Sequence, residues 1–337
     1  MRKVIYIINY LLCAITFVAA ISSCTKQDPV INAPYITFGI AGVDASTKSL
    51  MTNESLNSSA TRVTVYGVRN NTEKVFDKVL IKKDENSYNW SPENNYYKRT
   101  WQSGSYSFYG YTYSGTCTVE NEGTKITVSQ PTKYIEANMV DYLLSHAYKV
   151  SDGSNSHVVM LYMQHAMACA EIVVKQQMPE HKIKLDSITL SGLYRTASMI
   201  CEDQANANSG EKNVWMTYLQ GSNTELSYTK KFNSYRDNDN LLGNMTILAI
   251  PQQLTQSTVL TINYSVDEDN NEVTDPTTYS QSFELFNYKP YVWESGHKVR
   301  YTLTINTGVE LKAEIADWIN AGYTEGVIIP TGQNQQQ

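Results

Sequence analysis

The residue with the clearest chemical potential is Cys24, which directly follows the sequence Ile21-Ser22-Ser23. Two cations at the N-terminus precede an apolar run from Val4 to Ile21. This order of charges, apolar residues and small residues predicts a secretory signal peptide over residues 1–23. The small residues placed directly before a cysteine indicate a lipobox, at which the signal peptide is removed and a lipid is attached.

Cleavage before Cys24 leaves its thiol and its new amino group open to acylation, for example by palmitate. Each buried CH₂ contributes about 0.8 kcal/mol, so stable anchoring needs more than one acyl chain. A multiply acylated Cys24 therefore predicts a protein tethered to a membrane outside the cytoplasm. The alternatives are a plain signal peptide and an N-terminal membrane anchor, for which the apolar run is only marginally long enough.

Other constellations that carry chemistry are absent from the sequence. The five histidines show no H-x-x-x-H or H-E-x-x-H spacing, and there is no G-x-S-x-G motif, phosphate-binding glycine loop or calcium loop. We therefore predict no catalytic residue, no metal site, no cofactor and no enzymatic activity. A glycosidase pair of carboxylates depends only on spatial separation, so the sequence leaves that alternative open.

The mature chain keeps three cysteines, Cys117, Cys169 and Cys201, without any C-x-x-C pair. This pattern supports neither a zinc site nor a thioredoxin-like motif. Buried thiols that pack as small hydrophobes are the simplest interpretation. The sequence also leaves one disulfide among the three open.

Charge and composition narrow the class of protein. The net charge is −6 and no basic stripe runs along the chain, which argues against nucleic acid as a partner. The chain holds 25 tyrosines and only 18% charged residues, a balance that favours strands over exposed helices.

Alternating apolar residues mark the first strand, Tyr35 to Ile40, in which Ile36, Phe38 and Ile40 share one face. No window of 12 or more residues has a convincing helical period. About a dozen strands with polar turns predict an all-β protein made of antiparallel β-sandwiches. The further expected strands are Val63–Val68, Val79–Ile81, Trp101–Tyr113, Lys125–Val128, Tyr142–Tyr148, Val158–Met163, Ala168–Lys175, Leu185–Leu190, Trp215–Leu219, Met245–Ile250, Val259–Val266, Tyr279–Phe286 and Lys298–Ile305.

The length of 337 residues suits two domains of roughly 150 residues each after signal removal. Asp152-Gly153 is a turn dipeptide near the middle, so we expect an N-terminal domain over 24–153 and a C-terminal domain over 154–337. At the end of the chain Val327, Ile328 and Ile329 form a short apolar strand before a polar tail. Such a strand docks on its own sheet or is lent to a neighbour.

Aromatic side chains offer a second kind of site, because exposed rings stack on sugars. The candidates are Trp90, Tyr96, Tyr97, Trp101 and the cluster Tyr106–Tyr113. The competing interpretation is a sandwich core with cross-strand aromatic pairs, and we favour it.

Six stretches, taken in order, resemble the fimbrillin family of Bacteroidota lipoproteins, which are subunits of donor-strand pili. Their order and spacing cover nearly the whole mature chain. They are Ile21-Ser22-Ser23-Cys24; Trp101-x-x-Gly104-x-Tyr106-x-Phe108-x-Gly110-Tyr111; Asp141-Tyr142-Leu143-Leu144 with Ala147; Val158–Lys175 around His165-Ala166; Ile250-Pro251-Gln252; and Trp293-x-x-Gly296-x-x-x-x-Tyr301 followed by Asp317-Trp318.

The resemblance implies two tandem transthyretin-like β-sandwich domains and export to the outer membrane as a surface lipoprotein. It also implies proteolytic removal of the first strand, with Ile36, Phe38 and Ile40, and refilling of the groove by the C-terminal strand of another subunit. Loss of a central strand leaves unpaired N–H and C=O groups beside an apolar slot, which another strand can fill. In this chain the donor residues would be Val327, Ile328 and Ile329.

The resemblance also implies an arginine-specific cut in the loop after the first strand. Arg62 is the first candidate cleavage site and Lys48 the second. If neither is cut, the chain keeps its lipid and first strand and acts as an anchor or free surface lipoprotein. The implied partners are other fimbrial subunits, the outer membrane and an adhesion target on a host or bacterial surface. The alternative function is that of a surface glycan-binding lipoprotein.

Overall fold

The computed structural model describes residues 34–41, 61–85, 89–112, 117–139, 141–154, 158–178, 180–202, 215–219, 225–235, 240–267 and 276–316. Within these residues nearly all regular structure is β-strand, which confirms the all-β class expected from the sequence. The helices there are four short 3-10 turns, and none is long and apolar enough to cross a membrane. They are η1 (Asn95–Tyr97), η2 (Asn121–Gly123), η3 (Glu136–Asn138) and η4 (Leu285–Asn287).

The first sheet has eight strands in the order β10-β8-β5-β2-β3-β4-β1-β9. Its last strand, β9, continues through Met163 into β10, and β10 pairs with β8 at the other end of the order. The sheet therefore wraps around a single core. Its strands are β1 (Phe38–Ala41), β2 (Val63–Arg69), β3 (Glu73–Lys83), β4 (Trp90–Pro92), β5 (Ser103–Thr112), β8 (Leu143–Asp152), β9 (Val159–Tyr162) and β10 (Gln164–His165).

The core of this sheet is rich in aromatic rings. Phe108 of β5 contacts Phe38, Phe76 and Trp101, with ring centroids between 5.6 and 6.2 Å apart. Aromatic rings bury large apolar areas and favour such edge-to-face contacts, so this cluster accounts for much of the stability of the first sheet. Gly110 lies close to Leu161, since a Cβ atom there would come within 2.9 Å of the leucine methyl group.

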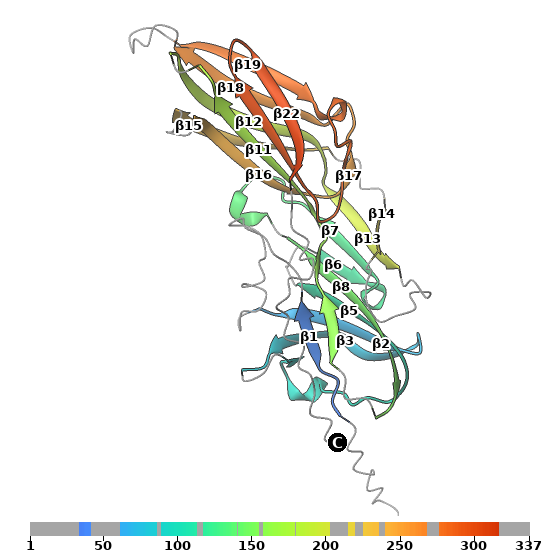
Figure 1. Cartoon of the computed structure of the whole chain (residues 1–337). Coiled ribbons are helices and arrows are strands. Elements are labelled where there is room, and N and C mark those ends of the chain that lie inside the picture. Colours follow the sequence, from blue (N-terminus) through green and yellow to red (C-terminus); the bar gives the residue numbers. More distant parts are fainter. Residues whose placement is uncertain are drawn as a thin grey trace, which may run out of the picture.

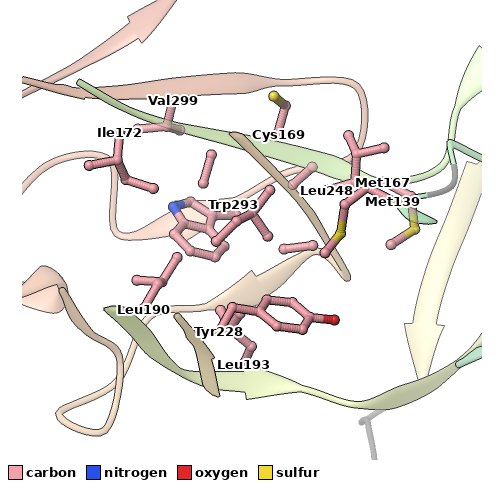
Figure 2. Close-up of a cluster of buried hydrophobic side chains, with 14 of the residues drawn as sticks. Met139, Met167, Cys169, Ile172, Leu190, Leu193, Tyr228, Leu248, Trp293 and Val299 are labelled. Carbon is pink, nitrogen blue, oxygen red and sulfur yellow. The ribbon is translucent and has the colours of Figure 1, made fainter. Parts of the chain in front are cut away.

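The C-terminal half forms a sandwich of two four-stranded sheets, ordered β16-β11-β21-β22 and β15-β12-β18-β19. Trp293 lies in the middle of the core between them (Figure 2). Its indole N–H donates to the hydroxyl of Tyr301 over 2.8 Å. The strands are β11 (Ala168–Gln176), β12 (Lys182–Tyr194), β15 (Glu225–Tyr235), β16 (Leu241–Ala249), β18 (Val259–Asp267), β19 (Thr277–Glu284), β21 (Lys298–Ile305) and β22 (Val309–Ala316), with the small ladder β17 (Gln252–Gln253) and β20 (Val292–Trp293) beside them.

A further four-stranded sheet, β14-β13-β7-β6, joins the two halves of the molecule. β6 (Cys117–Glu120) and β7 (Lys125–Ser129) come from the N-terminal half, whereas β13 (Thr196–Glu202) and β14 (Trp215–Leu219) come from the C-terminal half. Figure 1 shows these strands between the two ends of an elongated molecule. Met139 and Met167 extend the C-terminal core toward this joint (Figure 2).

The strand order differs from the sequence expectation in two ways. Two neighbouring pairs, β1 with β9 and β11 with β21, run parallel, although only antiparallel neighbours were expected. In addition, β9 and β10 follow the boundary expected at residue 153 but belong to the sheet of the N-terminal half. Parallel pairs require long crossovers, which a local sequence pattern does not reveal.

Candidate functional site

The candidate site is the position of the first strand, β1, inside the eight-stranded sheet. Phe38 pairs with Trp90 of β4 on one side and with Val159 of β9 on the other. The pairing with β4 is antiparallel and the pairing with β9 is parallel. β1 is therefore an interior strand that closes the gap between its two neighbours, β4 and β9. Figure 1 shows β1 in the half of the molecule that also holds β2, β3 and β5.

The three residues expected to fill the slot of this strand are all buried. Ile36, Phe38 and Ile40 are 1%, 0% and 9% exposed. The Phe38 ring meets the rings of Phe76 and Phe108 edge to face, at centroid distances of 5.5 and 5.6 Å. These side chains form the centre of the apolar core of the first sheet.

Backbone hydrogen bonds hold the strand over a longer stretch than β1 itself. They begin at Pro34 and end at Ala41, in agreement with the expected strand over Tyr35–Ile40. The bonds outside the regular ladder are Ile36 N to Arg99 O (2.8 Å), Trp101 N to Pro34 O (3.1 Å), Val159 N to Thr37 O (2.8 Å) and Met163 N to Ala41 O (2.8 Å).

The opposite face of β1 is shaped by Gly39. A Cβ atom at this position would collide with the sulfur atom of Met160, which covers the strand from outside. The strand thus fits a narrow space, with large apolar side chains inward and no side chain toward Met160. Chemically, the site offers backbone hydrogen bonds and an apolar slot, which are the two requirements for binding an extended strand.

The first candidate cleavage residue, Arg62, lies directly before β2. Its guanidinium forms an ion pair with Glu93, with Nη2 and Oε1 3.0 Å apart. The next residue, Val63, is fully buried and pairs with Ile81 and Thr112. The peptide bond after Arg62 therefore enters a central strand. The other candidates, Cys24, Lys48, Val327, Ile328 and Ile329, lie outside the described residues.

Two residues from the family-like stretches, Asp141 and His165, form a buried pair. Asp141 Oδ2 lies 2.6 Å from His165 Nδ1, and the two side chains are 2% and 1% exposed. Ser295 donates to the carbonyl oxygen of His165 over 2.6 Å, and Gly296 N donates to Met167 O over 2.9 Å. The pair thus lies where the chain passes from the first sheet to the C-terminal sandwich.

Gln252, from another of these stretches, forms hydrogen bonds with backbone groups of β12 at a point where the register of that strand shifts. Its Oε1 accepts from Tyr194 N and its Nε2 donates to Gly192 O, both over 2.9 Å. Gly192 has a φ of 73°, and a Cβ atom there would collide with the backbone carbonyl of Ser257. Nothing in the sequence predicted these two hydrogen bonds of Gln252. A glycine inside an alternating strand was the available signal of a bulge.

Most of the aromatic residues considered for sugar stacking are buried, which confirms the favoured interpretation of a sandwich core and rules these residues out as a sugar-binding surface. Tyr96 and Tyr97 are the exceptions, with 77% and 41% exposure. Tyr113 lies outside the described residues. The buried members, none above 3% exposure, are Trp90, Trp101, Tyr106, Tyr109 and Tyr111.

Cys169 is buried in the core and forms no disulfide. Burial raises the pKa of its thiol to about 12, so the thiol is protonated and unreactive at neutral pH. Cys117 is half-buried, and the side chain of Cys201 lies outside the description. No group of three or more His, Cys, Asp or Glu residues in the described ranges is placed to hold a metal ion.

The fold defines a class of elongated all-β proteins in which a wrapped sheet with an interior first strand is followed by a β-sandwich. Within this class, the chain belongs to the fimbrillin-like family, whose family model matches residues 47–318. Among curated proteins, no sequence matches this chain.

Two solved cell adhesion proteins share the fold at low sequence identity. A provisionally named cell adhesion protein from Bacteroides uniformis aligns with a TM-score of 0.53 and 13% identity, over 84% of this chain and 99% of its own. A second such protein, from Bacteroides ovatus, aligns with a TM-score of 0.50 and 15% identity, over 85% and 98%. The fimbrial anchor protein Mfa2 from Porphyromonas gingivalis aligns with a TM-score of 0.36 and 8% identity, over 86% and 100%.

Proposed function

We propose that this chain is a non-enzymatic structural subunit of cell-surface fimbriae that assembles by proteolysis-triggered donor-strand exchange and supports adhesion. The observation that carries the proposal is the interior position of β1, with Ile36, Phe38 and Ile40 buried between β4 and β9. Membership in the fimbrillin-like family supports the same role.

Removal of the first strand would leave backbone groups without partners along β9, at Trp90 of β4, and at Arg99 and Trp101, beside the apolar slot of Phe38. An open slot of this kind binds an added strand strongly, because the strand restores both hydrogen bonds and apolar contacts. In the proposal, Val327, Ile328 and Ile329 of a neighbouring subunit supply that strand. The partners are accordingly further fimbrial subunits, of the same or another kind.

Export precedes assembly in this proposal. The chain leaves the cytoplasm through its signal peptide, is acylated at Cys24 and reaches the outer face of the outer membrane. Proteolysis after Arg62 or Lys48 then releases the lipid together with the first strand. A cut after Arg62 requires the start of β2 to open transiently, because Val63 is buried; a cut after Lys48 does not involve that strand.

Deletion of residues 24–62 tests strand exchange directly. The purified protein is expected to form oligomers that resist heating in detergent, and Ile328→Asp is expected to abolish them. Ile315→Asp provides the matched control, because Ile315 is 64% exposed on β22 and should leave the oligomers intact. Monomers from the deletion variant would rule out strand exchange through this slot.

The N-terminal sequence of the protein from cells and from surface filaments tests the processing step. A start just after Arg62 or Lys48 supports a polymerising subunit. A blocked, acylated Cys24 leaves the slot filled by β1 and favours an anchor or a surface glycan-binding lipoprotein.

A further inference from the structure

Exposed tyrosines gather at one end of the molecule. Six tyrosine side chains in the described part of the chain are exposed, and three of them, Tyr35, Tyr96 and Tyr97, lie around η1 and the segment that leads into β1. The start of β1 lies at the end of the molecule away from β18 and β19 (Figure 1). Exposed aromatic rings that lie near one another mark a candidate binding surface.

The two rings on η1 are held in a fixed arrangement. Their centroids lie 5.3 Å apart, with an angle of 83° between the ring planes. Asn94 caps the turn, because its Oδ1 accepts from Tyr96 N over 2.9 Å and its carbonyl accepts from Tyr97 N over 3.0 Å. The backbone that carries these rings is thus already ordered, which lowers the entropy cost of binding a ligand to them.

Tyr35 is tied to the same surface by backbone and side-chain contacts. It forms an isolated bridge with Thr100, and the next residue donates its N–H to Arg99 O over 2.8 Å. The ammonium group of Lys98 lies 5.7 Å from the centre of the Tyr35 ring. Lys98 is the residue that ends η1, so its contact with Tyr35 places that ring next to the turn.

The local charge is opposite to that of the whole protein. Arg99 Nη1 donates to the carbonyl oxygens of Tyr96 and Lys98 over 2.9 and 3.0 Å, which fixes a second cation beneath the turn. Across the described ranges neither Lys98 nor Arg99 pairs with an acidic side chain. In a chain of net charge −6, this surface carries cations that can bind an anionic ligand.

We infer that Tyr35, Tyr96, Tyr97 and Lys98, together called the tyrosine platform, bind a glycan that contains uronic acid. Tyrosine rings offer rigid contact area to the C–H face of a sugar and a hydroxyl group to its rim. Lys98 supplies the positive charge for the sugar carboxylate. The inference does not rest on strand exchange. Tyr35 belongs to the first strand that the proposed processing removes, whereas Tyr96, Tyr97 and Lys98 lie outside that strand and remain in the processed chain.

The size of the platform argues against a second copy of the chain as its occupant. Three partly exposed rings offer on the order of 400 Å². A stable protein interface takes roughly 800 Å² from each partner. A run of two or three sugar rings fits the available area better.

Isothermal titration calorimetry of the purified full-length chain tests the inference. The probes are hyaluronan and polygalacturonate oligosaccharides, which carry uronic acids, and chitin oligosaccharides as neutral controls. We expect binding of at least one acidic probe and none of the neutral one. Tyr96→Ala should weaken binding roughly tenfold, the usual loss at a central tyrosine of a binding surface. Lys98→Gln should weaken it about two- to fivefold and remove most of its salt dependence.

Tyr148→Ala is the matched control, because Tyr148 is 49% exposed on β8 and lies outside the platform. Circular dichroism of each variant verifies the fold. The inference is overturned if the wild-type chain binds neither acidic probe, if Tyr96→Ala binds as well as Tyr148→Ala, or if the neutral probe binds equally. Self-association that is lost in Tyr96→Ala, measured by sedimentation, would assign the platform to a contact between copies.

Discussion

The carboxylate of Asp141 lies 2.6 Å from the imidazole of His165, and both side chains are almost completely buried. Asp141 precedes β8 and His165 ends β10, so the contact fixes the point at which the chain leaves the first sheet. Ala166 N also donates to Tyr142 O over 2.7 Å, so a backbone hydrogen bond joins the residues that follow His165 and Asp141. The pair thus sets the path of the chain toward β11.

Removal of one partner should destabilise the protein strongly. Asp141→Ala leaves the buried imidazole of His165 without its carboxylate partner, and we expect the free energy of unfolding to fall by about 3–5 kcal/mol. Urea denaturation measures this loss. Asp77→Ala serves as the control, because the Asp77 side chain is 64% exposed. Equal effects of the two substitutions would contradict the structural role of the pair.

The ring of Phe38 should account for much of the stability that β1 provides. Phe38→Ala removes a fully buried ring that contacts two others, and we expect a loss of about 3–5 kcal/mol. Tryptophan fluorescence during urea denaturation reports the change, since Trp90 pairs with Phe38. Tyr35→Ala, at an exposed position just before the same strand, should change stability by at most about 0.5 kcal/mol. A similarly small loss in Phe38→Ala would show that β1 contributes little to the core.

Gln252 and its neighbour Gln253 form a matched pair for testing the bulge in β12. Gln252→Ala leaves the N–H of Tyr194 and the C=O of Gly192 without their partner, at a cost of about 2–4 kcal/mol. Gln253 is exposed, so Gln253→Ala should have almost no effect. Thermal unfolding of both variants distinguishes them, and a small shift in Gln252→Ala would argue against this role.

Glu171 should give part of the protein's stability a dependence on pH. Burial alone raises the pKa of its carboxyl, but Arg300 and Lys298, 2.7 and 3.0 Å from Oε2, lower the pKa below its ordinary value of 4.5. The stabilisation is therefore present above pH 4.5 and is lost as the pH falls through the lower value in the folded protein.

Glu171→Gln tests this dependence. Its deficit in unfolding free energy against the wild type should be largest at neutral pH and should shrink as the pH falls below 4.5. Denaturant titrations across this range measure the deficit. Glu310→Gln, on the exposed face of the neighbouring β22, is the control and should show no such trend. A deficit that stays constant with pH would contradict the assignment.

Local patterns in the sequence were sufficient to predict the bounds of several strands that have one buried face. The expected strands Val63–Val68, Lys125–Val128 and Lys298–Ile305 match β2, β7 and β21 to within one residue at either end. β22 (Val309–Ala316) was missed although its apolar residues Val309, Leu311, Ala313 and Ile315 alternate with polar ones. β15 (Glu225–Tyr235) was missed as well, because lysine and serine interrupt its apolar pattern.

Long-range relationships could not be predicted from the sequence. The slot residues Ile36, Phe38 and Ile40 were found from their alternation, but nothing local indicates that β9 is their parallel neighbour. Tyr96 and Trp101 are close in sequence, yet one is 77% and the other 2% exposed. Exposure depends on how distant strands cover a residue, so aromatic content favoured a core but could not single out Tyr96 and Tyr97 as the exposed members.

The sheet shared by β6, β7, β13 and β14 has a mechanical consequence. A filament subunit under flow is stretched and bent, and a single covalent linker between its halves would act as a swivel. Here the strand pair β7–β13 spans the joint, with Thr196 opposite Ser129 and Ile200 opposite Lys125. Tension that passes through the subunit is distributed over a whole ladder of backbone bonds, so the subunit behaves as a stiff rod.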